Sequence, residues 1–289
     1  MGNLMMQKFF RLLFIGFALF FASLAFAEND GTRCSERNLA GIDMNADIKY
    51  LDEIKSKIKS KEGVDSLDLF QLLFVEKHKE KLRSKLNSGF DINSCGGPFD
   101  SSLLGLAAAL GEMDDVKTII EYGANLEFPK GSGGQSALIS AISSNSYEAA
   151  NYLIRKGADM KTTYGKYEDG VLHALARSPA DKRRNETEEL DLARKFMASG
   201  VSPDKKNKDP LLDVTPLMLA IIYYKPSLVE LFVECGADPY IKDQKGRDSF
   251  EFARTRRDKI IGEKMLNILQ SRHASSSCTR AHGLGKSTD

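Results

Sequence analysis

The four histidines of this chain are the first residues to test for catalysis, since imidazole is the side chain that most readily transfers protons near neutral pH. His78 lies in a lysine-rich segment that we expect to be an exposed helix, and His173 lies at a helix start. His273 and His282 lie in the last residues of the chain. No Gly-x-Ser-x-Gly or His-Glu-x-x-His motif accompanies them. The sequence therefore predicts no catalytic residue and favours a protein that is not an enzyme.

Paired acids and glycine-rich stretches do not predict a site either. Asp114-Asp115 and Glu188-Glu189 lie near expected helix starts, where adjacent acids are commonly surface charges that match the helix dipole. The stretch from Phe128 to Gly134 lacks the Gly-Lys-Ser/Thr ending of a phosphate loop, so we expect a loop tip. No Cys or Cys/His pair has the spacing of metal ligands. We predict neither a metal nor a cofactor.

An exported protein can use its cysteines to form disulfides. The four cysteines of this chain allow three complete pairings. Cys235 stands directly before a helix-ending glycine, where we expect a thiol that packs as a small apolar side chain. Cys34 and Cys95 form the better pair. Such a bond would tie the N-terminal segment to the first loop of the repeats.

A repeat of about 34 residues organises the elements that would position any site. Its clearest sign is a corner of the type Gly-Ala-Asp, and the spacings between the five corner glycines are 34, 34, 43 and 36. The corners are Gly89-Phe90-Asp91, Gly123-Ala124-Asn125, Gly157-Ala158-Asp159, Gly200-Val201-Ser202 and Gly236-Ala237-Asp238. This period is typical of a solenoid, in which each unit buries its apolar face against its neighbours. A binding surface is therefore the expected function.

Each unit has the pattern of two helices. A capping residue stands 21 residues before four of the corner glycines, at Asp68, Ser102, Ser136 and Thr215. Small residues follow on the expected first helix, and large apolar residues recur at three-and-four spacing on the second. The corner glycine then ends the second helix in a left-handed conformation.

The sequence resembles the ankyrin repeat family in Thr215–Ala220, in Val171–Ala176 and in the Gly-Ala-Asp or Gly-Ala-Asn corners. The segment Gly246–Ala253 is similar to the opening of a final, capping repeat. The resemblance implies an all-α helical-hairpin solenoid with an N-terminal capping helix, a C-terminal capping repeat and a protein-binding function. One departure is that the usual histidine of the helix start survives only at His173.

The expected organisation follows from the leader, the repeats and the composition of the ends. We predict a helix from Asp47 to Ser60 that covers the first repeat. The predicted segments are a signal peptide (1–27), an N-terminal arm and capping helix (28–65), an ankyrin repeat domain (66–271) and a flexible tail (272–289). Within the domain the repeats run over about 66–98, 99–132, 133–166, 167–211 and 212–245, and the capping repeat over 246–271.

Residues 1–27 have the form of a secretory leader. Lys8 and Arg11 precede an apolar run from Leu12 to Leu24, and Ala25-Phe26-Ala27 places small residues at the cleavage positions. An uncleaved anchor is the alternative, since the run approaches the length of a spanning helix. We predict cleavage after Ala27, no membrane span in the mature chain, and a periplasmic or secreted protein.

Composition and net charge indicate which classes of partner the chain can bind. The chain has 289 residues, of which 42% are hydrophobic and 28% charged, with a formal net charge of +1. These values are typical of an ordered globular chain rather than a disordered or multi-span membrane protein. Near-neutrality argues against nucleic acid as a partner, because such binders carry a basic stripe. We expect a monomer that binds a protein of unknown identity.

The resemblance also implies where that partner binds, namely the loop tips and the exposed side of the first helices. The candidate residues are Phe99, Ser101, Gln135, Ser143, Ser144, Tyr164, Tyr167, Asp169, Arg177, Ile222 and Tyr223. Tyrosine and arginine suit interface centres, although packing of these aromatics between units is the alternative. Since Tyr167 lies in a charged loop, we expect it to be exposed. We also expect Tyr167→Ala with Arg177→Ala to weaken partner binding without unfolding the protein.

Three functions from different classes remain open. The leading one is an exported module that binds a partner protein, such as an inhibitor or immunity-type protein of the periplasm. The second is a secreted effector that engages host proteins. The third is a hydrolase with an unrecognised site, which would need a deep polar pocket that a solenoid seldom has.

Overall fold

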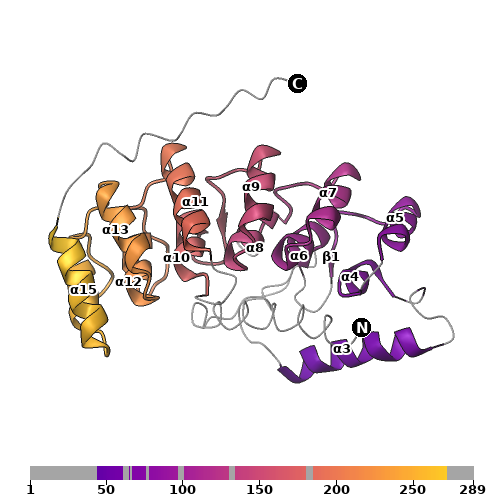
Figure 1. The fold of residues 1–289 in the computed structure, drawn as a ribbon, viewed down its shortest axis with the longest axis horizontal. Coiled ribbons are helices and arrows are strands. Elements are labelled where there is room, and N and C mark those ends of the chain that lie inside the picture. The colour runs from indigo at the N-terminus through magenta and orange to yellow at the C-terminus, as the bar shows by residue number, and fades with distance from the viewer. Residues whose placement is uncertain are drawn as a thin grey trace. The chain divides into compact units, whose positions relative to one another are not determined.

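The computed structural model describes residues 44–60, 65, 67–75, 78–96, 101–129, 134–179 and 185–271. They fall into two compact units. Unit 1 comprises the residues up to Asp159 together with 178–183, and unit 2 comprises 160–177 and the residues from Arg184 onward. Helices in consecutive pairs make up almost all of both units (Figure 1). The prediction of an all-α helical-hairpin solenoid is thus confirmed. The predicted leader and tail lie outside the described residues.

Unit 1 begins with the predicted capping helix and continues with paired helices. Its elements are α3 (Met44–Lys59), α4 (Leu69–Leu72), α5 (Lys79–Asn87), β1 (Cys95–Gly96), β2 (Ser101–Ser102), α6 (Leu103–Leu110), α7 (Met113–Glu121), α8 (Ala137–Ser143) and α9 (Tyr147–Arg155). First helices pack on first helices, α4 on α6 and α6 on α8, and the second helix α7 packs on α9 (Figure 1). The unit is therefore two layers of helices.

Small residues let the first helices of unit 1 approach closely. Ala107, Ala108 and Ala141 are fully buried at the contact of α6 with α8. A Cβ atom built on Gly105 would lie 2.9 Å from the hydroxyl of Ser102 and 3.3 Å from that of Ser140. A side chain at Gly105 would push these hydroxyl groups away. The glycine, which stands where the family usually has a histidine, therefore leaves room for the close contact of α6 with α8.

Helix α3 covers the first repeat, as predicted. Ile54 is fully buried, and the ring of Tyr50 packs edge-on against Phe74, with 6.2 Å between centroids. The side-chain amide of Gln71 donates to Glu53 at 3.2 Å and accepts from Lys57 at 3.1 Å. Tyr50 and Ile54 of this helix thus pack within the chain.

Unit 2 contains three helical pairs in the same arrangement. Its elements are β3 (Thr163–Tyr164), β4 (Asp169–Gly170), α10 (Val171–Arg177), α11 (Glu186–Ala198), α12 (Pro216–Ile222), α13 (Pro226–Glu234), α14 (Ser249–Arg254) and α15 (Lys259–Gln270). The first helices form one layer, α10 on α12 on α14, and the second helices α11, α13 and α15 form the other. Helix α11 has 13 residues where α13 has 9, so part of the insertion before it forms additional helix.

The Gly-Ala-Asp corners end the second helices as predicted. Gly123 has φ 88° and Gly236 has φ 83°, a region in which a side chain would be strained. After each of them the next amide reaches back five residues, from Ala124 to Ile119 and from Ala237 to Phe232. The corner's polar residue then accepts from the amide two residues further on, as Asn125 does at 2.9 Å.

The corners also link one repeat to the next. The amide of Asn125 donates to the side chain of Asn93 at 2.8 Å, and the amide of Asp159 donates to Glu127 at 2.8 Å. In unit 2 the amide of Asp238 donates to Asp204, again at 2.8 Å. Each contact satisfies a backbone amide with a side chain from the preceding repeat, so the spacing between corners is held by hydrogen bonds as well as by the apolar core.

All four predicted capping residues occupy N-cap positions. Asp68 accepts from Gln71 at 2.8 Å within a capping box, Ser102 accepts from Gly105 at 3.0 Å, and Thr215 accepts from Met218 at 3.3 Å. Ser136 is also the N-cap of α8, without a side-chain hydrogen bond among the described residues.

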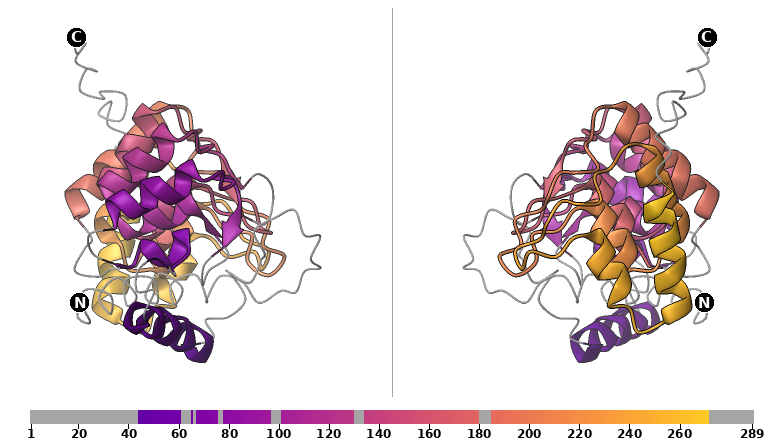
Figure 2. Two further views of the ribbon diagram at one scale, coloured as in Figure 1. Left: turned by 90° about the vertical axis from the view of Figure 1, so that its right-hand side faces the viewer. Right: turned by 90° about the vertical axis from the view of Figure 1, so that its left-hand side faces the viewer.

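The loops between repeats project from one side of each unit, as Figure 2 shows for unit 1 on the left and unit 2 on the right. Two of them carry a short antiparallel pair, with Cys95 opposite Ser102 and Thr163 opposite Gly170. None of the helices in the described part of the chain has the length and apolarity needed to cross a membrane.

Candidate partner-binding surface

Two neighbouring loops of unit 2 combine an exposed large apolar side chain with exposed lysines. One runs from Gly200 to Thr215, two residues longer than the loop from Gly123 to Ser136, and the other follows the corner at Gly236. The side chain of Leu211 is 63% exposed at the first of them. We call Lys208, Leu211, Gln244 and Lys245, all exposed residues of these loops, the tip surface.

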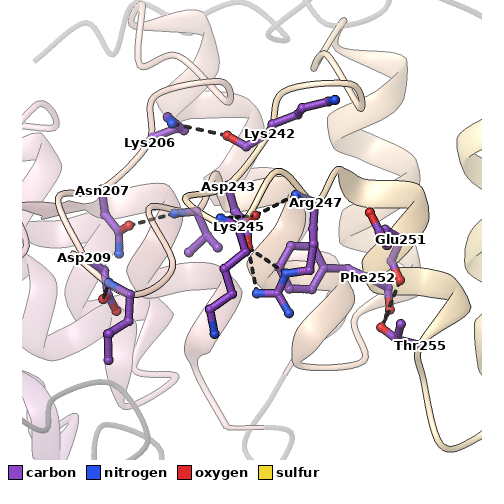
Figure 3. A network of polar contacts seen from close by, with 12 residues as sticks. Lys206, Asn207, Asp209, Lys242, Asp243, Lys245, Arg247, Glu251, Phe252 and Thr255 are labelled. Atoms are coloured by element: carbon purple, nitrogen blue, oxygen red, sulfur yellow. Dashed lines mark hydrogen bonds and ion pairs between the residues drawn. The ribbon is translucent and has the colours of Figure 1, made fainter.

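Hydrogen bonds join the two loops beneath the tip surface. The amide of Gln244 donates to the carbonyl of Leu212 at 2.9 Å, and the ammonium group of Lys206 donates to the carbonyl of Lys242 at 3.2 Å (Figure 3). Lys206 also pairs with Asp213 in its own loop. The two loops therefore hold each other in place, which reduces the entropy that a partner would have to remove on binding.

Asp243 is the centre of the second loop. Its carboxylate accepts from the amides of Lys245 and Arg247 at 2.9 and 2.7 Å and from the Arg247 guanidinium at 2.9 and 2.7 Å (Figure 3). Burial alone would raise the pKa of Asp243, but these donors lower it below its usual value. The guanidinium also lies 4.5 Å from the ring centroid of Phe252.

Two acidic residues of these loops are buried, whereas several lysines are exposed. Asp209 and Asp243 are 8% and 5% exposed, and each carboxylate accepts hydrogen bonds from its own loop. Lys205, Lys242 and Lys245 are exposed and form no ion pair with any described residue. These lysines thus give the exposed part of the loops positive charge, although the formal charges of the two loops balance.

A buried polar cluster supports the first loop from below. The guanidinium of Arg177, at the end of α10, pairs with Asp169 of β4, and the amide of Asn207 donates to Asp169 at 2.8 Å. Asn207 in turn accepts from the amide of Val214 at 2.9 Å. Burial alone would lower the pKa of Arg177, but Asp169 raises it above its usual value, so the guanidinium stays charged.

His173 adds a neutral imidazole to this cluster. It is 1% exposed, and its Nδ1 accepts from the amide of Gly170 at 3.1 Å. The proton therefore sits on Nε2, which donates to the carbonyl of Val214 at 3.2 Å in the next repeat. Burial lowers the pKa of His173 to about 4, opposed by Asp169 and assisted by Arg177. This is the structural role that the sequence predicted for His173.

We expect acid to destabilise unit 2 through His173. The unfolded imidazole titrates near its ordinary pKa of about 6.5, whereas the folded group titrates at about 4. Above pH ~6.5 the neutral His173 contributes fully to the free energy of unfolding. As the pH falls to about 4, the imidazole takes up a proton in the unfolded state but not in the folded state, which lowers the free energy of unfolding by about 3 kcal/mol. Urea midpoints of wild type and His173→Gln between these values should therefore diverge, with a shallower pH slope in the variant. Equal slopes would contradict this assignment.

The residues that the sequence predicted to touch a partner differ in their exposure to solvent. Half-buried positions are found for Ser101, Gln135, Ile222 and Tyr223, and Phe99 lies outside the described residues. Buried positions are found for Ser143, Ser144, Tyr164, Tyr167, Asp169 and Arg177. Within unit 2 the cluster around Arg177 brings Tyr164, Asp169 and Tyr223 together, because all three act electrostatically on its guanidinium.

The expected exposure of the six buried residues is therefore wrong, and Tyr167 in particular is buried. The reason is that the end of a first helix faces the loop in front of it, so polar groups there find partners within the chain. Arg177 finds Asp169, and the Ser144 hydroxyl donates to the carbonyl of Ser140 at 2.7 Å. Burial and Asp169 also raise the pKa of Tyr164 above its usual value. These side chains are therefore held by contacts within the chain and are not open to solvent.

Sequence reasoning also misplaced a histidine in unit 1. His78 is buried, and its Nε2 lies 2.9 Å from both carboxylate oxygens of Asp115, while its Nδ1 lies 2.5 Å from the carbonyl of Val75. Both ring nitrogens face acceptors, so the contacts suit a doubly protonated imidazolium. His78 is thus not an exposed residue, and Asp115 is not a surface charge. Instead, the pair ties the first repeat to α7.

Unit 2 contains a further buried ion pair that the sequence did not predict, between Lys225 and Glu189. The ammonium group of Lys225 lies 2.6 Å from Glu189 and 2.6 Å from the carbonyl of Leu175, and neither charged side chain is exposed. Lys225 precedes α13 and Glu189 lies in the first turns of α11. The sequence indicates only that residues Glu186–Glu189 can form the first turn of α11. It does not indicate that Glu189 meets a lysine of the next repeat.

The cysteines differ in part from the expectation. Neither Cys95 nor Cys235, the two described cysteines, is a free thiol, so the interpretation of Cys235 as a packed thiol is wrong. Cys34 lies outside the described residues, and its pairing with Cys95 stays a prediction. Among the residues that the structure describes, no group of His, Cys, Asp or Glu is arranged to hold a metal ion.

Comparisons with known proteins agree with this architecture. A family model described as ankyrin repeats in three copies matches residues 61–164, and a model of a single ankyrin repeat matches residues 213–244. No curated protein matches the chain. Among solved structures, a chain of the complex of the predatory endopeptidase Bd0816 from Bdellovibrio bacteriovorus with immunity protein Bd3460 is similar. Its TM-score is 0.56 at 23% identity, over 70% of this chain and 98% of that chain.

Proposed function

Because the chain belongs to the ankyrin repeat family, we propose that it binds another protein through the tip surface of unit 2. The single observation that carries this proposal is the exposed Leu211 on loops that are held together by hydrogen bonds and that also carry the exposed, unpaired Lys245. An apolar side chain at the centre of a polar rim is the usual anatomy of an interface. The positive rim fits a partner with an acidic surface.

We further propose that half-buried residues at the ends of first helices, or just before them, make secondary contacts with the partner. Ile222 and Tyr223 end α12, and Ser101 and Gln135 precede first helices in unit 1. Each leaves part of its side chain open to solvent, whereas Arg177 and Asp169 do not. We therefore keep these four residues as candidate contacts.

We further propose that the partner is an enzyme of the same exported compartment, which this protein inhibits as an immunity-type protein. The leader-like residues 1–27 motivate the compartment. The similar solved complex, whose title joins an endopeptidase to an immunity protein, motivates the role, although a likeness at 23% identity concerns the fold alone. Detection of the native protein in osmotic-shock fluid supports a periplasmic inhibitor, whereas detection in the culture medium favours a secreted effector.

The tip surface makes a direct prediction for binding. We expect Leu211→Asp to weaken the affinity for the partner at least about 30-fold and Lys245→Glu about fivefold, because buried interface anchors contribute about 2 kcal/mol or more and rim charges about 1 kcal/mol. The partner is first purified from the native host with wild-type protein, and its affinity for each variant is then measured by calorimetry.

Matched controls come from α15, where Ile260 is 80% exposed and Lys264 is also exposed. Ile260→Asp and Lys264→Glu make the same chemical changes on another element of unit 2. They should leave the affinity within about twofold, and all four variants should unfold at the same urea concentration because they are surface substitutions. Tip variants that bind as tightly as the controls would remove this surface from the proposal.

A further inference from the structure

The second helices of unit 1 carry a cluster of cations that the proposed function does not use. Tyr152 of α9 has three positive groups near its ring, from Lys117 of α7, Arg155 of α9 and Lys156 at the end of α9. Their distances to the ring centroid are 6.0, 5.7 and 5.5 Å. Helices α7 and α9 pack side by side (Figure 1). We call these four residues the Tyr152 patch.

The charges of the Tyr152 patch are not neutralised within the described chain. Lys117, Arg155 and Lys156 are exposed, and none forms an ion pair with a described residue. Asp114 and Asp115 of α7 pair with Lys79 and His78, and Glu121, which is exposed one turn after Lys117, forms no ion pair with the patch. Three like charges around one ring repel one another, and an incoming anion would relieve that repulsion.

We propose that the Tyr152 patch binds a carboxylate-rich segment of a protein partner. Arginine offers paired donors to a carboxylate, the two lysines add point charges, and the tyrosine ring supplies flat apolar area with a polar end. This surface lies on the second helices of unit 1, whereas the tip surface lies on loops of unit 2. It is therefore a separate binding site on the chain.

The alternative occupant, an anionic membrane surface, fits the structure less well. Interfacial binding needs large apolar side chains that enter the bilayer next to the cations. Among the described residues the exposed large hydrophobic side chains are Leu211, Tyr224, Tyr240 and Ile260, and all of them belong to unit 2. Unit 1 offers only the half-buried Tyr152 beside its cations.

The test compares two triple variants of the full mature protein that remove the same charges. The patch variant carries Lys117→Gln, Arg155→Gln and Lys156→Gln. The control variant carries Arg257→Gln, Lys259→Gln and Lys264→Gln, three exposed cations in or just before α15 of unit 2. Each is titrated with poly-L-glutamate and, separately, with phosphatidylglycerol vesicles at low and physiological salt. The control corrects for the loss of net charge, which alone weakens binding of any anion.

We expect wild type and the control variant to bind poly-L-glutamate with affinities within about threefold of each other, and the patch variant to bind at least about tenfold more weakly. Tyr152→Leu in the wild-type background should weaken binding about threefold, since it keeps the charges and removes the ring. Equal affinity of patch and control variants would overturn the proposal. Binding to the vesicles with none to poly-L-glutamate would also overturn it, in favour of a membrane surface. The tip surface is unchanged in all of these proteins, so any binding of poly-L-glutamate to it contributes equally to each.

Discussion

Lys225→Met should lower the free energy of unfolding of unit 2 by about 3–5 kcal/mol. The ammonium group of Lys225 is fully buried at 2.6 Å from Glu189, and its removal leaves a carboxylate in the interior without its cation. Methionine has a similar length and keeps the packing of the stem. A loss of this size is a large fraction of the stability of a typical domain, and it should appear as a clear drop in the urea midpoint followed by circular dichroism.

The double variant Lys225→Met with Glu189→Leu separates the cost of the unpaired charge from the value of the pair. Buried ion pairs replaced by apolar residues of similar volume are often neutral in stability, so the second substitution should restore most of the loss. The free energy of unfolding will not recover completely, because the carbonyl of Leu175 loses the hydrogen bond that Lys225 donates to it. A double variant as unstable as Lys225→Met alone would mean that the lysine acts through packing.

The regular parts of this fold follow closely from the sequence, because they depend on local chemistry. Gly123 and Gly236 are needed where the backbone has positive φ, and Ser102 and Thr215 are needed where a helix starts with unpaired amides. These requirements recur with each repeat and are met by residues close together in the chain. Hence the spacing of corners and caps predicts the helical pairs.

The polar interior could not be predicted in the same way. Periodicity assigns His78, Asp115, Glu189 and Lys225 to the polar side of their segments, yet all four are buried. Their partners lie 36 or 37 residues apart, in the neighbouring repeat, and a pair of opposite charges at that distance has no local signal. Where a repeat brings two such groups together, pairing replaces hydration, so polarity alone does not mean exposure.

The candidate site shows the same limit. The resemblance to ankyrin repeats points to loops and first-helix ends as the binding side, but it does not show which side chains are exposed there. Leu211 was not among the candidates, although the longer loop that carries it is visible in the spacing between Gly200 and Thr215. The exposed lysines were missed because the formal charges of these loops balance, and only the structure shows that Asp209 and Asp243 are buried.

Arg177→Met should destabilise unit 2 by about 3–5 kcal/mol, where the sequence alone suggested a harmless surface change. Asp169 would stay buried with the Asn207 amide as its remaining donor among the contacts described above. Asn207 also bonds both backbone groups of Val214, whose carbonyl accepts from His173, so the loss should spread from α10 to the loop before α12. Arg177→Lys should recover part of the loss, because it keeps the charge without the planar donors of the guanidinium.

The exposed pair of Arg194 with Asp191 in α11, 3.1 Å apart, is the matched control. Arg194→Met should cost less than about 0.5 kcal/mol, because solvent screens an exposed pair. Hydrogen exchange in unit 2 gives the second readout, and the amides of Gly170 and Val214 should lose protection in Arg177→Met before those of α14. If Arg177→Met unfolds at the wild-type urea concentration, the cluster does not stabilise the loop, and Arg177 returns to the candidate partner contacts.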